Sequence, residues 1–426
     1  MAVLLASAAV VALAYGARKT LAREALTAWL RRQGVQSEIT FSSFDASGAT
    51  GALRIGPPDH PALVAEVAEV RYDLLGFWSG DPFGARVTYV RLAGPVLHGR
   101  LHDGKLSLGA LDPLIERLRR QPAQPDRGQP KIEIDGADIV LDTDYGRIEA
   151  LADLRANDGR LQRMDARLGP TDLKGPAVTG QVAAAELHLV AFQDRLALAG
   201  ALAAPRLRQG GADLKGVQVR LTGQAPYPDL KARSGAGRIE LSLSADAQAL
   251  SSGGLSLTEV RQTGRFSGAL KGWIDDLSVT GSTTASTTAR GLKGRGLEAT
   301  DLRLDAAAPD LTWSRAQADR VTGGVRLDGG ARRLTAPGGM IVTGLAVRGD
   351  GPISVGRDGW SAVLTGGLSG RGQLPSGSGV RALQDLTLQA PGLRVAAASA
   401  RPLTVDLLEP AKLSPASGGL IVVQSA

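Results

Sequence analysis

The most constraining feature of this chain is a short alternation of apolar and polar residues that stops at Gly, Asp or Pro and then begins again. It runs from Ile132 to the C-terminus and is clear at 217–221 and 239–243. A period of two places the apolar side chains on one face of an extended strand. Roughly 300 residues written in this way, with almost no helical pattern, predict a long antiparallel meander with one apolar face.

Composition indicates how the strands are connected and how thick a core the sheet can have. The 426 residues include 55 Gly and 22 Pro, which suits many turns, but only 4% are aromatic. Few large side chains are therefore available to fill a thick globular core. We expect a mainly β fold in which an elongated antiparallel meander curls into an open, taco-like β-groove, with an N-terminal membrane helix and a short amphipathic helix.

The formal net charge of +7 is spread rather than clustered. Arg220, Arg326 and Arg348 each occupy a polar position of a strand pattern, which indicates a solvated face rather than a nucleic-acid-binding patch. Attraction to anionic lipid surfaces stays open. The chain has no cysteine, so it has neither a disulfide frame nor a thiolate site, in keeping with the cytoplasm or a periplasm.

The first residues carry the signal for localisation. Residues 2–16 form an uncharged apolar run, followed by Arg18, Lys19 and Arg23. The run is short for a bilayer span and lacks a clear cleavage motif, so it is either a signal segment or, as we favour, an uncleaved anchor. No cation precedes it, from which we expect the natural start to lie upstream. The expected anchor residues are Leu4, Leu5, Val10, Val11 and Leu13.

The pattern divides the chain into four parts. Residues 1–35 are expected to form the membrane anchor and an amphipathic helix, and 36–120 a β-rich N-terminal cap region. Residues 121–130, rich in Pro and Gln, have no apolar periodicity and are interpreted as a linker. Residues 131–426 are then the elongated β-groove.

Motifs for catalysis or metal binding are weak. His98 and His102 lie on either side of a strand without the Glu of a metalloprotease motif, and the Asp142 to Gly146 segment lacks the closing Glu of a calcium loop. A relaxed dinucleotide fingerprint at Gly294 has no strand and long helix around it, and no hydrolase nucleophile motif occurs. We therefore predict no enzyme activity, no metal and no cofactor.

Aliphatic side chains at alternate positions form the candidate site. Its expected lining residues are Val217, Val219, Leu221, Ile239, Leu241, Leu243, Leu255, Leu257, Val325, Leu327, Leu386 and Leu388. Residues of this kind usually pack against a second sheet as core. With so few aromatics and helices to cover the face, the alternative is an open trough. Acyl chains entering it would leave water at roughly 0.8 kcal/mol per CH₂.

One block of the chain also carries a family resemblance. In order, it contains an anchor and helix, "LRIGPP", "EVAEVRYDL", "VRLAGPVLHGRL", "DGKLSLGALDPL" and "ADIVLDTDYGRIEA". Over about residues 17–155 it resembles the AsmA-like superfamily, in particular the YdbH and TamB branch. The resemblance implies an inner-membrane-anchored periplasmic protein whose sheet forms an open apolar groove and moves phospholipid toward the outer membrane.

The predicted function is thus to shield acyl chains and conduct phospholipids between the inner and outer membranes, with one span and the bulk of the chain in the periplasm. The alternatives are a binding or structural β-solenoid or β-sandwich protein of the envelope and a periplasmic hydrolase. An apolar strand at 420–423 lies close to the C-terminus. Because an apolar edge invites strand pairing, we expect a β-augmenting outer-membrane or periplasmic partner there, or a missing C-terminal half.

Overall fold

The computed structural model describes most of the chain after residue 33. The described residues are 27, 31, 34–45, 47–74, 85–102, 105–113, 116, 130–158, 160–176, 178–227, 235–272, 276–315, 319–356, 359–373, 386–398, 401–415 and 421–423. The predicted anchor, most of the predicted amphipathic helix and all of the predicted linker except Pro130 lie outside the described residues. Within the described residues, no helix has both the length and the apolar character required to cross a membrane.

The chain divides into two compact units. Unit 1 comprises Met1–Pro176 and Ala184–Phe192, and unit 2 comprises Ala177–Ala183 and Gln193–Ala426. The strands of unit 1 are β1 (Ser37–Phe44), β2 (Gly48–Ile55), β3 (Leu63–Leu74), β4 (Ala85–Ala93), β5 (Val96–His102), β6 (Lys105–Ser107), β7 (Lys131–Thr143), β8 (Gly146–Asn157), β9 (Arg160–Leu168), β10 (Thr171–Lys174) and β12 (Ala184–Phe192). A 3₁₀ turn, η1 (Gly109–Leu111), follows β6.

Unit 2 has longer strands. They are β11 (Val178–Val182), β13 (Arg195–Gln209), β14 (Ala212–Pro226), β15 (Gly235–Ser252), β16 (Leu255–Gly272), β17 (Ser278–Gly294), β18 (Leu297–Ser314), β19 (Arg320–Thr335), β20 (Ile341–Gly356), β21 (Gly359–Gln373), β22 (Leu386–Ala398), β23 (Arg401–Leu407), β24 (Ala411–Pro415) and β25 (Ile421–Val423). A second 3₁₀ turn, η2 (Pro337–Gly339), precedes β20.

Unit 1 departs from a purely antiparallel meander at one strand. β4 and β5 follow each other in line, both antiparallel to β3, and are separated by Gly94 and Pro95. β7 pairs in parallel with both of them. Parallel neighbours need a crossover connection, and β6 and the 3₁₀ turn at Gly109–Leu111 lie in the chain between β5 and β7. The sequence pattern predicts strands but does not predict this crossover, because the alternation carries no information about strand direction.

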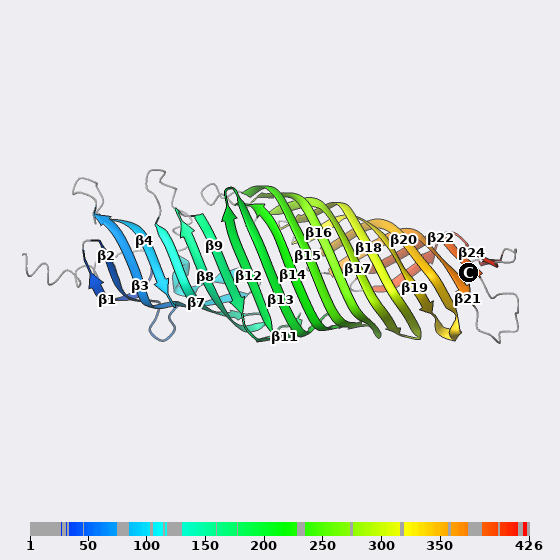
Figure 1. The fold of residues 1–426 in the computed structure, drawn as a ribbon, viewed down its shortest axis with the longest axis horizontal. Helices are drawn as coiled ribbons and strands as arrows, with labels where there is room; N and C mark the ends of the chain where they lie inside the picture. Colours follow the sequence, from blue (N-terminus) through cyan, green and yellow to red (C-terminus); the bar gives the residue numbers. More distant parts are fainter. Residues whose placement is uncertain are drawn as a thin grey trace, which may run out of the picture. The chain divides into compact units, whose positions relative to one another are not determined.

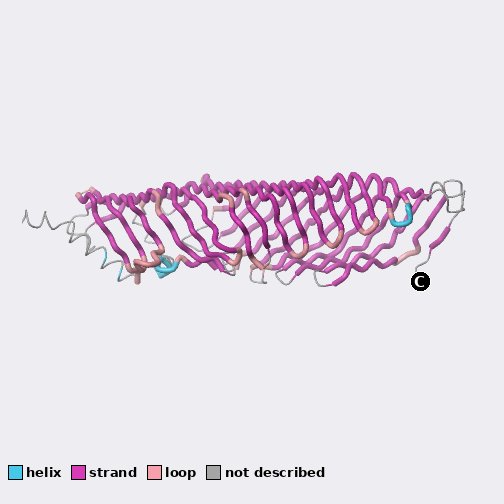
Figure 2. The backbone as a smooth tube through the Cα atoms, turned by 90° about the horizontal axis from the view of Figure 1, so that it is seen from below, coloured by secondary structure: helices cyan, strands magenta, loops and turns pink. Residues whose placement is uncertain are grey.

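Unit 2 confirms the antiparallel meander. From β13 to β22 each strand pairs with the next one along the chain in antiparallel register, as Figure 1 shows. In a parallel β-helix, successive strands would instead stack in parallel. The observed pairing therefore differs from the β-solenoid alternative. The strands are also bent along their length, as the middle and right of Figure 2 show.

A small aliphatic core lies at the start of unit 1. Val35, Ile39 and Ile55 are buried together. Phe41, Leu53, Leu63, Ala110 and Leu111 pack against them, so the residues of η1 close one end of the β1–β3 sheet. Val35 is 1% exposed. This cluster anchors the chain as it enters the first strand.

Candidate functional site

The cross-strand register of unit 2 aligns leucines into a continuous row, which we call the aliphatic row. Its members, one on each of β13 to β20, are Leu207, Leu214, Leu250, Leu257, Leu292, Ala299, Leu334 and Val342. Directly paired residues on one face of an antiparallel sheet have side chains in contact distance. The row therefore forms a strip of aliphatic side chains across eight neighbouring strands.

A second strip of smaller apolar residues runs beside the first. It contains Ala204, Val217, Ala247, Val260, Ala289, Leu302, Ala331 and Leu345. Four of these residues, Ala204, Val217, Ala289 and Ala331, are at most 7% exposed. The spacing of hydrogen-bonded strands does not change with side-chain size, so the low exposure shows that neighbouring side chains cover these positions.

Between the two strips, each strand has one residue that is not paired across the sheet. We call these residues the offset row. Its members are Pro205, Gly216, Gln248, Glu259, Arg290, Asp301, Arg332 and Gly344. Leu214 and Val217 are three residues apart and would face opposite sides of an uninterrupted strand. One extra residue at the same height in every strand restores the phase, so both apolar strips belong to one face.

The offset row has a distinctive backbone and charge pattern. On alternate strands its residues have positive φ: Gly216 at 60°, Glu259 at 49°, Asp301 at 52° and Gly344 at 59°. Two neighbouring pairs carry opposite charges, with 2.7 Å between Arg290 Nη1 and Glu259 Oε1 and 3.6 Å between Arg332 Nη1 and Asp301 Oδ2. Each of these exposed ion pairs contributes little energy. The charged residues of the offset row alternate in sign from strand to strand, so that two like charges are never direct neighbours.

The apolar face continues beyond the two strips. Val219 pairs with Ala245, and Leu221 pairs with Leu243. Further along the row of Val219, which also contains Gln262 and Thr287, Leu304 is 44% exposed and Val347 is 39% exposed. At these two positions the aliphatic side chains are therefore open to solvent and are not interlocked with a covering layer.

The residues predicted from the sequence are placed as follows. Val217 and Ile239 are buried, and Val219, Leu221, Leu241, Leu243, Leu255, Leu257, Val325 and Leu327 are half-buried. Leu386 and Leu388 lie on β22, paired with Gly372 and Gly370. The register brings Leu221, Leu243 and Leu327 into one row through Gly264, Ala285 and Ala306. Whether these residues line a lipid groove stays a prediction.

Sequence reasoning missed most of the aliphatic row. Apart from Leu257, none of its eight members is among the predicted lining residues, although Leu207, Leu214, Leu250, Leu292 and Leu334 are all large and aliphatic. The available signal is a pair of apolar positions three residues apart, such as Leu214 and Val217, which marks a phase change inside one strand.

Unit 2 also contains two hollows of about 780 Å³ and about 610 Å³. Of the predicted lining residues, Leu243 contributes to the larger hollow and Val325 to the smaller. Most of the remaining lining consists of Arg, Ser, Thr, Asp and small residues. The hollows are therefore chemically distinct from the aliphatic row.

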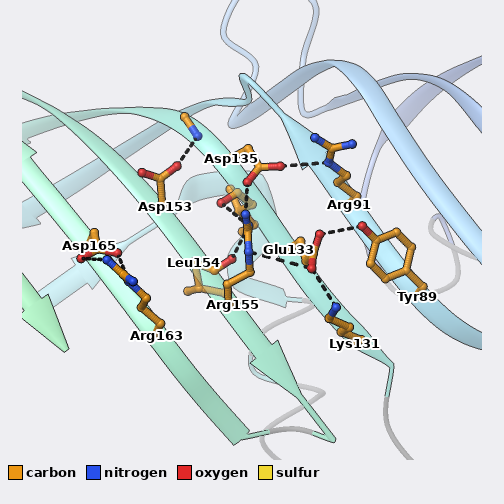
Figure 3. A network of polar contacts seen from close by, with 12 residues as sticks. Tyr89, Arg91, Lys131, Glu133, Asp135, Asp153, Leu154, Arg155, Arg163 and Asp165 are labelled. Atoms are coloured by element: carbon orange, nitrogen blue, oxygen red, sulfur yellow. Dashed lines mark hydrogen bonds and ion pairs between the residues drawn. The ribbon is translucent and has the colours of Figure 1, made fainter. Parts of the chain in front are cut away.

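Unit 1 carries a network of polar side chains around β7, shown in Figure 3. Tyr89 donates to Glu133 at 2.7 Å, and the Lys131 ammonium lies 2.9 Å from the same carboxylate. Arg91 and Arg155 both bind Asp135, Arg91 at 2.9 Å. The hydrogen bond from Arg155 is the main cause that lowers the pKa of Asp135. The network links β4, β7 and β8 and suits a structural role.

A histidine and an aspartate form a second polar pair in unit 1. His188 Nδ1 on β12 lies 2.6 Å from Asp165 Oδ1 on β9, and Arg163 binds the same carboxylate. Hydrogen bonds from Arg163 and then His188 lower the pKa of Asp165 to about 2. The hydrogen bond with Asp165 raises the pKa of His188 above its ordinary value of 6.5.

These shifts predict a pH dependence of stability. The raised pKa of His188 contributes stability below about pH 6.5, which is lost as pH rises through the folded-state pKa. The lowered pKa of Asp165 contributes above about pH 3.8, and this is lost as pH falls toward 2. We expect His188→Gln to lower the melting temperature of the full chain at pH 5.5 but not at pH 8.5, by circular dichroism. An equal loss at both pH values would contradict this.

Among the described residues, no group of three or more His, Cys, Asp or Glu side chains is arranged to hold a metal ion. The polar side chains around β7 instead form hydrogen bonds and ion pairs with one another. The apolar face of unit 2 is a surface with the capacity to bind an apolar ligand.

Comparison with known proteins agrees with this emphasis. A family model described as YdbH-like, intermembrane phospholipid transport protein YdbH, matches residues 4–420. Searches of curated proteins and of solved structures gave no match. The family match confirms the resemblance seen at 17–155 and extends it over nearly the whole chain. The chain belongs to the YdbH-like family, whose members act in intermembrane phospholipid transport.

Proposed function

We propose that this chain is an anchored β-groove protein that shields phospholipid acyl chains along the apolar face of unit 2 and conducts them between the inner and outer membranes without catalysis. The observation that carries the proposal is the aliphatic row, which crosses eight strands without a polar member. The family supplies the substrate class, and the row supplies a surface that suits acyl chains.

Movement along such a surface requires no chemical step. Leu, Val and Ala walls offer an acyl chain nearly the same dispersion contacts at each position, so no position holds it much more strongly than the next. Transfer from water is favourable by roughly 0.8 kcal/mol per CH₂, which keeps the chain on the face. Charged headgroups remain in solvent at the margin, because burying them without partners is costly.

The location follows from the same proposal. An inner-membrane anchor at Leu4, Leu5, Val10, Val11 and Leu13 would hold the protein at the donor membrane, with the bulk of the chain in the periplasm. The four-part organisation, with a cap region at 36–120 and a linker at 121–130, would place the groove beyond that anchor. Delivery to the outer membrane then needs a second contact.

A β-augmenting partner could supply that contact at the C-terminal edge. β25 (Ile421–Val423) pairs with β24, and in the described part of the chain no other strand pairs with it. An apolar edge strand presents unpaired backbone groups to which another chain can add a strand. We propose an outer-membrane or periplasmic protein as this partner.

Site-specific photo-crosslinking tests the acyl-binding face in cells. A photoreactive benzoylphenylalanine at Leu292, on the aliphatic row, is expected to give covalent phospholipid adducts of the full chain, detected by mass spectrometry. The matched control places benzoylphenylalanine at position 293 instead. The Lys293 side chain found there in the natural chain is exposed and lies 3.3 Å from Glu298. Adducts at Leu292 and not at Lys293 support the proposal. No lipid adduct at Leu292, or equal labelling at both sites, would overturn it.

A further inference from the structure

The larger hollow of unit 2 is lined by two complete rows of polar and small residues. The first row contains Arg220, Ser244, Thr263, Ser286, Asp305 and Asp328, and the second contains Thr222, Ser242, Arg265, Thr284, Ala307 and Arg326. Each row runs from β14 to β19, and the two are separated by one residue along every strand. Their side chains therefore share one face of the sheet.

That face is the one opposite the aliphatic row. Between the two polar rows lies the row of Leu243, Gly264, Ala285 and Ala306, which also contacts the hollow. The rows on either side of it on that face, which contain Val219 and Leu241, do not contribute to the hollow. A hollow on the apolar face would be walled by those flanking side chains, so the alternation places it on the polar face.

Charge is unevenly distributed within the hollow. The part over β14 to β17 contains Arg220 and Arg265 and no carboxylate, whereas Asp305, Asp328 and Arg326 lie over β18 and β19. Among the described residues, neither Arg220 nor Arg265 has a side-chain hydrogen bond or ion pair. Other arginines of these strands are paired: Arg238 Nε lies 2.8 Å from Glu240, and Arg261 Nε lies 3.6 Å from Asp246.

Hydroxyl groups surround the two unpaired guanidinium groups. Ser242 and Thr284 are the direct cross-strand neighbours of Arg265, and Ser244 is the neighbour of Arg220. β15 lies between the two arginine strands, which puts their Cα atoms about 12 Å apart from the strand spacing and rise. Two extended arginine side chains can converge over β15 from that separation.

From this arrangement we propose that the hollow binds a phosphate group between Arg220 and Arg265, over Ser242 and Ser244. Guanidinium groups bind phosphate oxygens in a bidentate manner, and serine and threonine hydroxyls donate to the remaining oxygens. The phosphate belongs either to a lipid headgroup or to a free phosphate ion. This site lies on the face opposite the proposed acyl path and does not depend on that path.

Isothermal titration calorimetry on the full chain in a phosphate-free maltoside detergent tests the site. The probes are inorganic phosphate and dihexanoyl phosphatidic acid below its micellar concentration. Arg220→Gln combined with Arg265→Gln is expected to weaken binding of at least one probe tenfold or more. The matched control is Arg348→Gln, which removes an arginine of the same polar surface that lies 3.2 Å from Asp328 and outside the hollow.

The two probes separate the sources of the phosphate. Binding of inorganic phosphate that the double variant loses supports a free-ion site, and a loss confined to phosphatidic acid supports a headgroup site. Absence of binding to the wild-type chain, or an equal loss in Arg348→Gln, would overturn the inference. Lipid adducts at Leu292 report on the acyl face separately, so the two proposals can fail independently.

Discussion

Replacing Leu257 with glutamate is expected to reduce the phospholipid that copurifies with the full chain by about tenfold or more. Leu257 lies in the middle of the aliphatic row, paired with Leu250 on one side and Leu292 on the other. A carboxylate there must either lose its hydration against acyl chains or exclude them, and burial of an unpaired charge costs several kcal/mol. Each 1.4 kcal/mol corresponds to a tenfold change in binding.

The neighbouring residue provides a matched control. Thr258 is exposed and pairs with Gly291 on the polar side of the same strand. Thr258→Glu therefore adds the same charge one position away without entering the apolar face. Lipid content per mole of protein is measured by mass spectrometry, and circular dichroism checks that both variants are folded. If Leu257→Glu keeps its lipid, or if both variants lose it equally, acyl chains do not use this row.

The period of two predicted the fold of unit 2 well because the antiparallel meander imposes it on every strand. The segments 217–221 and 239–243 both lie in strands, and Leu221 and Leu243 are direct partners. Alternation also identifies the apolar face at these positions, since neighbouring strands place their apolar residues in register. The family was correctly predicted from motifs that are specific in order and spacing, and its model matches residues 4–420.

The same rule failed where the strand changes phase. Gly216 and Asp301 resemble the end of one strand and the start of another, because Gly and Asp usually mark turns. In the structure both lie inside single strands, of 15 and 18 residues respectively. A local pattern cannot distinguish a turn from an extra residue that every neighbouring strand shares. That distinction depends on the register across the sheet, and for this reason most of the aliphatic row was missed.

The parallel pairing of β7 and the polar hollow lie beyond sequence reasoning for a related reason. Arg220 and Arg265 are 45 residues apart in the sequence, and only the register of β14 to β16 brings them to the same face. Taken singly, each arginine fits an ordinary solvated position. Their significance arises from the lack of a partner for both, which only the folded chain reveals.

Deletion of Glu259 is expected to leave the full chain folded. Glu259 is the offset residue of β16, and its removal makes the strand continuous between Leu257 and Val260. These two residues are then two positions apart in an uninterrupted strand, so they stay on one face. The cost is local, because Gln248 and Arg290, the offset residues of the neighbouring strands, lose the residue opposite them. We expect soluble protein with a cooperative thermal transition, measured by circular dichroism, and a lowered melting temperature.

A substitution at Glu259 tests the effect of its side chain while the extra residue stays in the strand. Glu259→Gly keeps the residue count, and glycine adopts the observed φ of 49° without steric cost. It also removes the ion pair with Arg290, which is exposed and therefore contributes at most about 1 kcal/mol. The variant is expected to fold with a melting temperature close to that of the wild-type chain. If the deletion abolishes folding whereas Glu259→Gly folds, the offset row does not set the phase of the sheet, and the two apolar strips need not share a face.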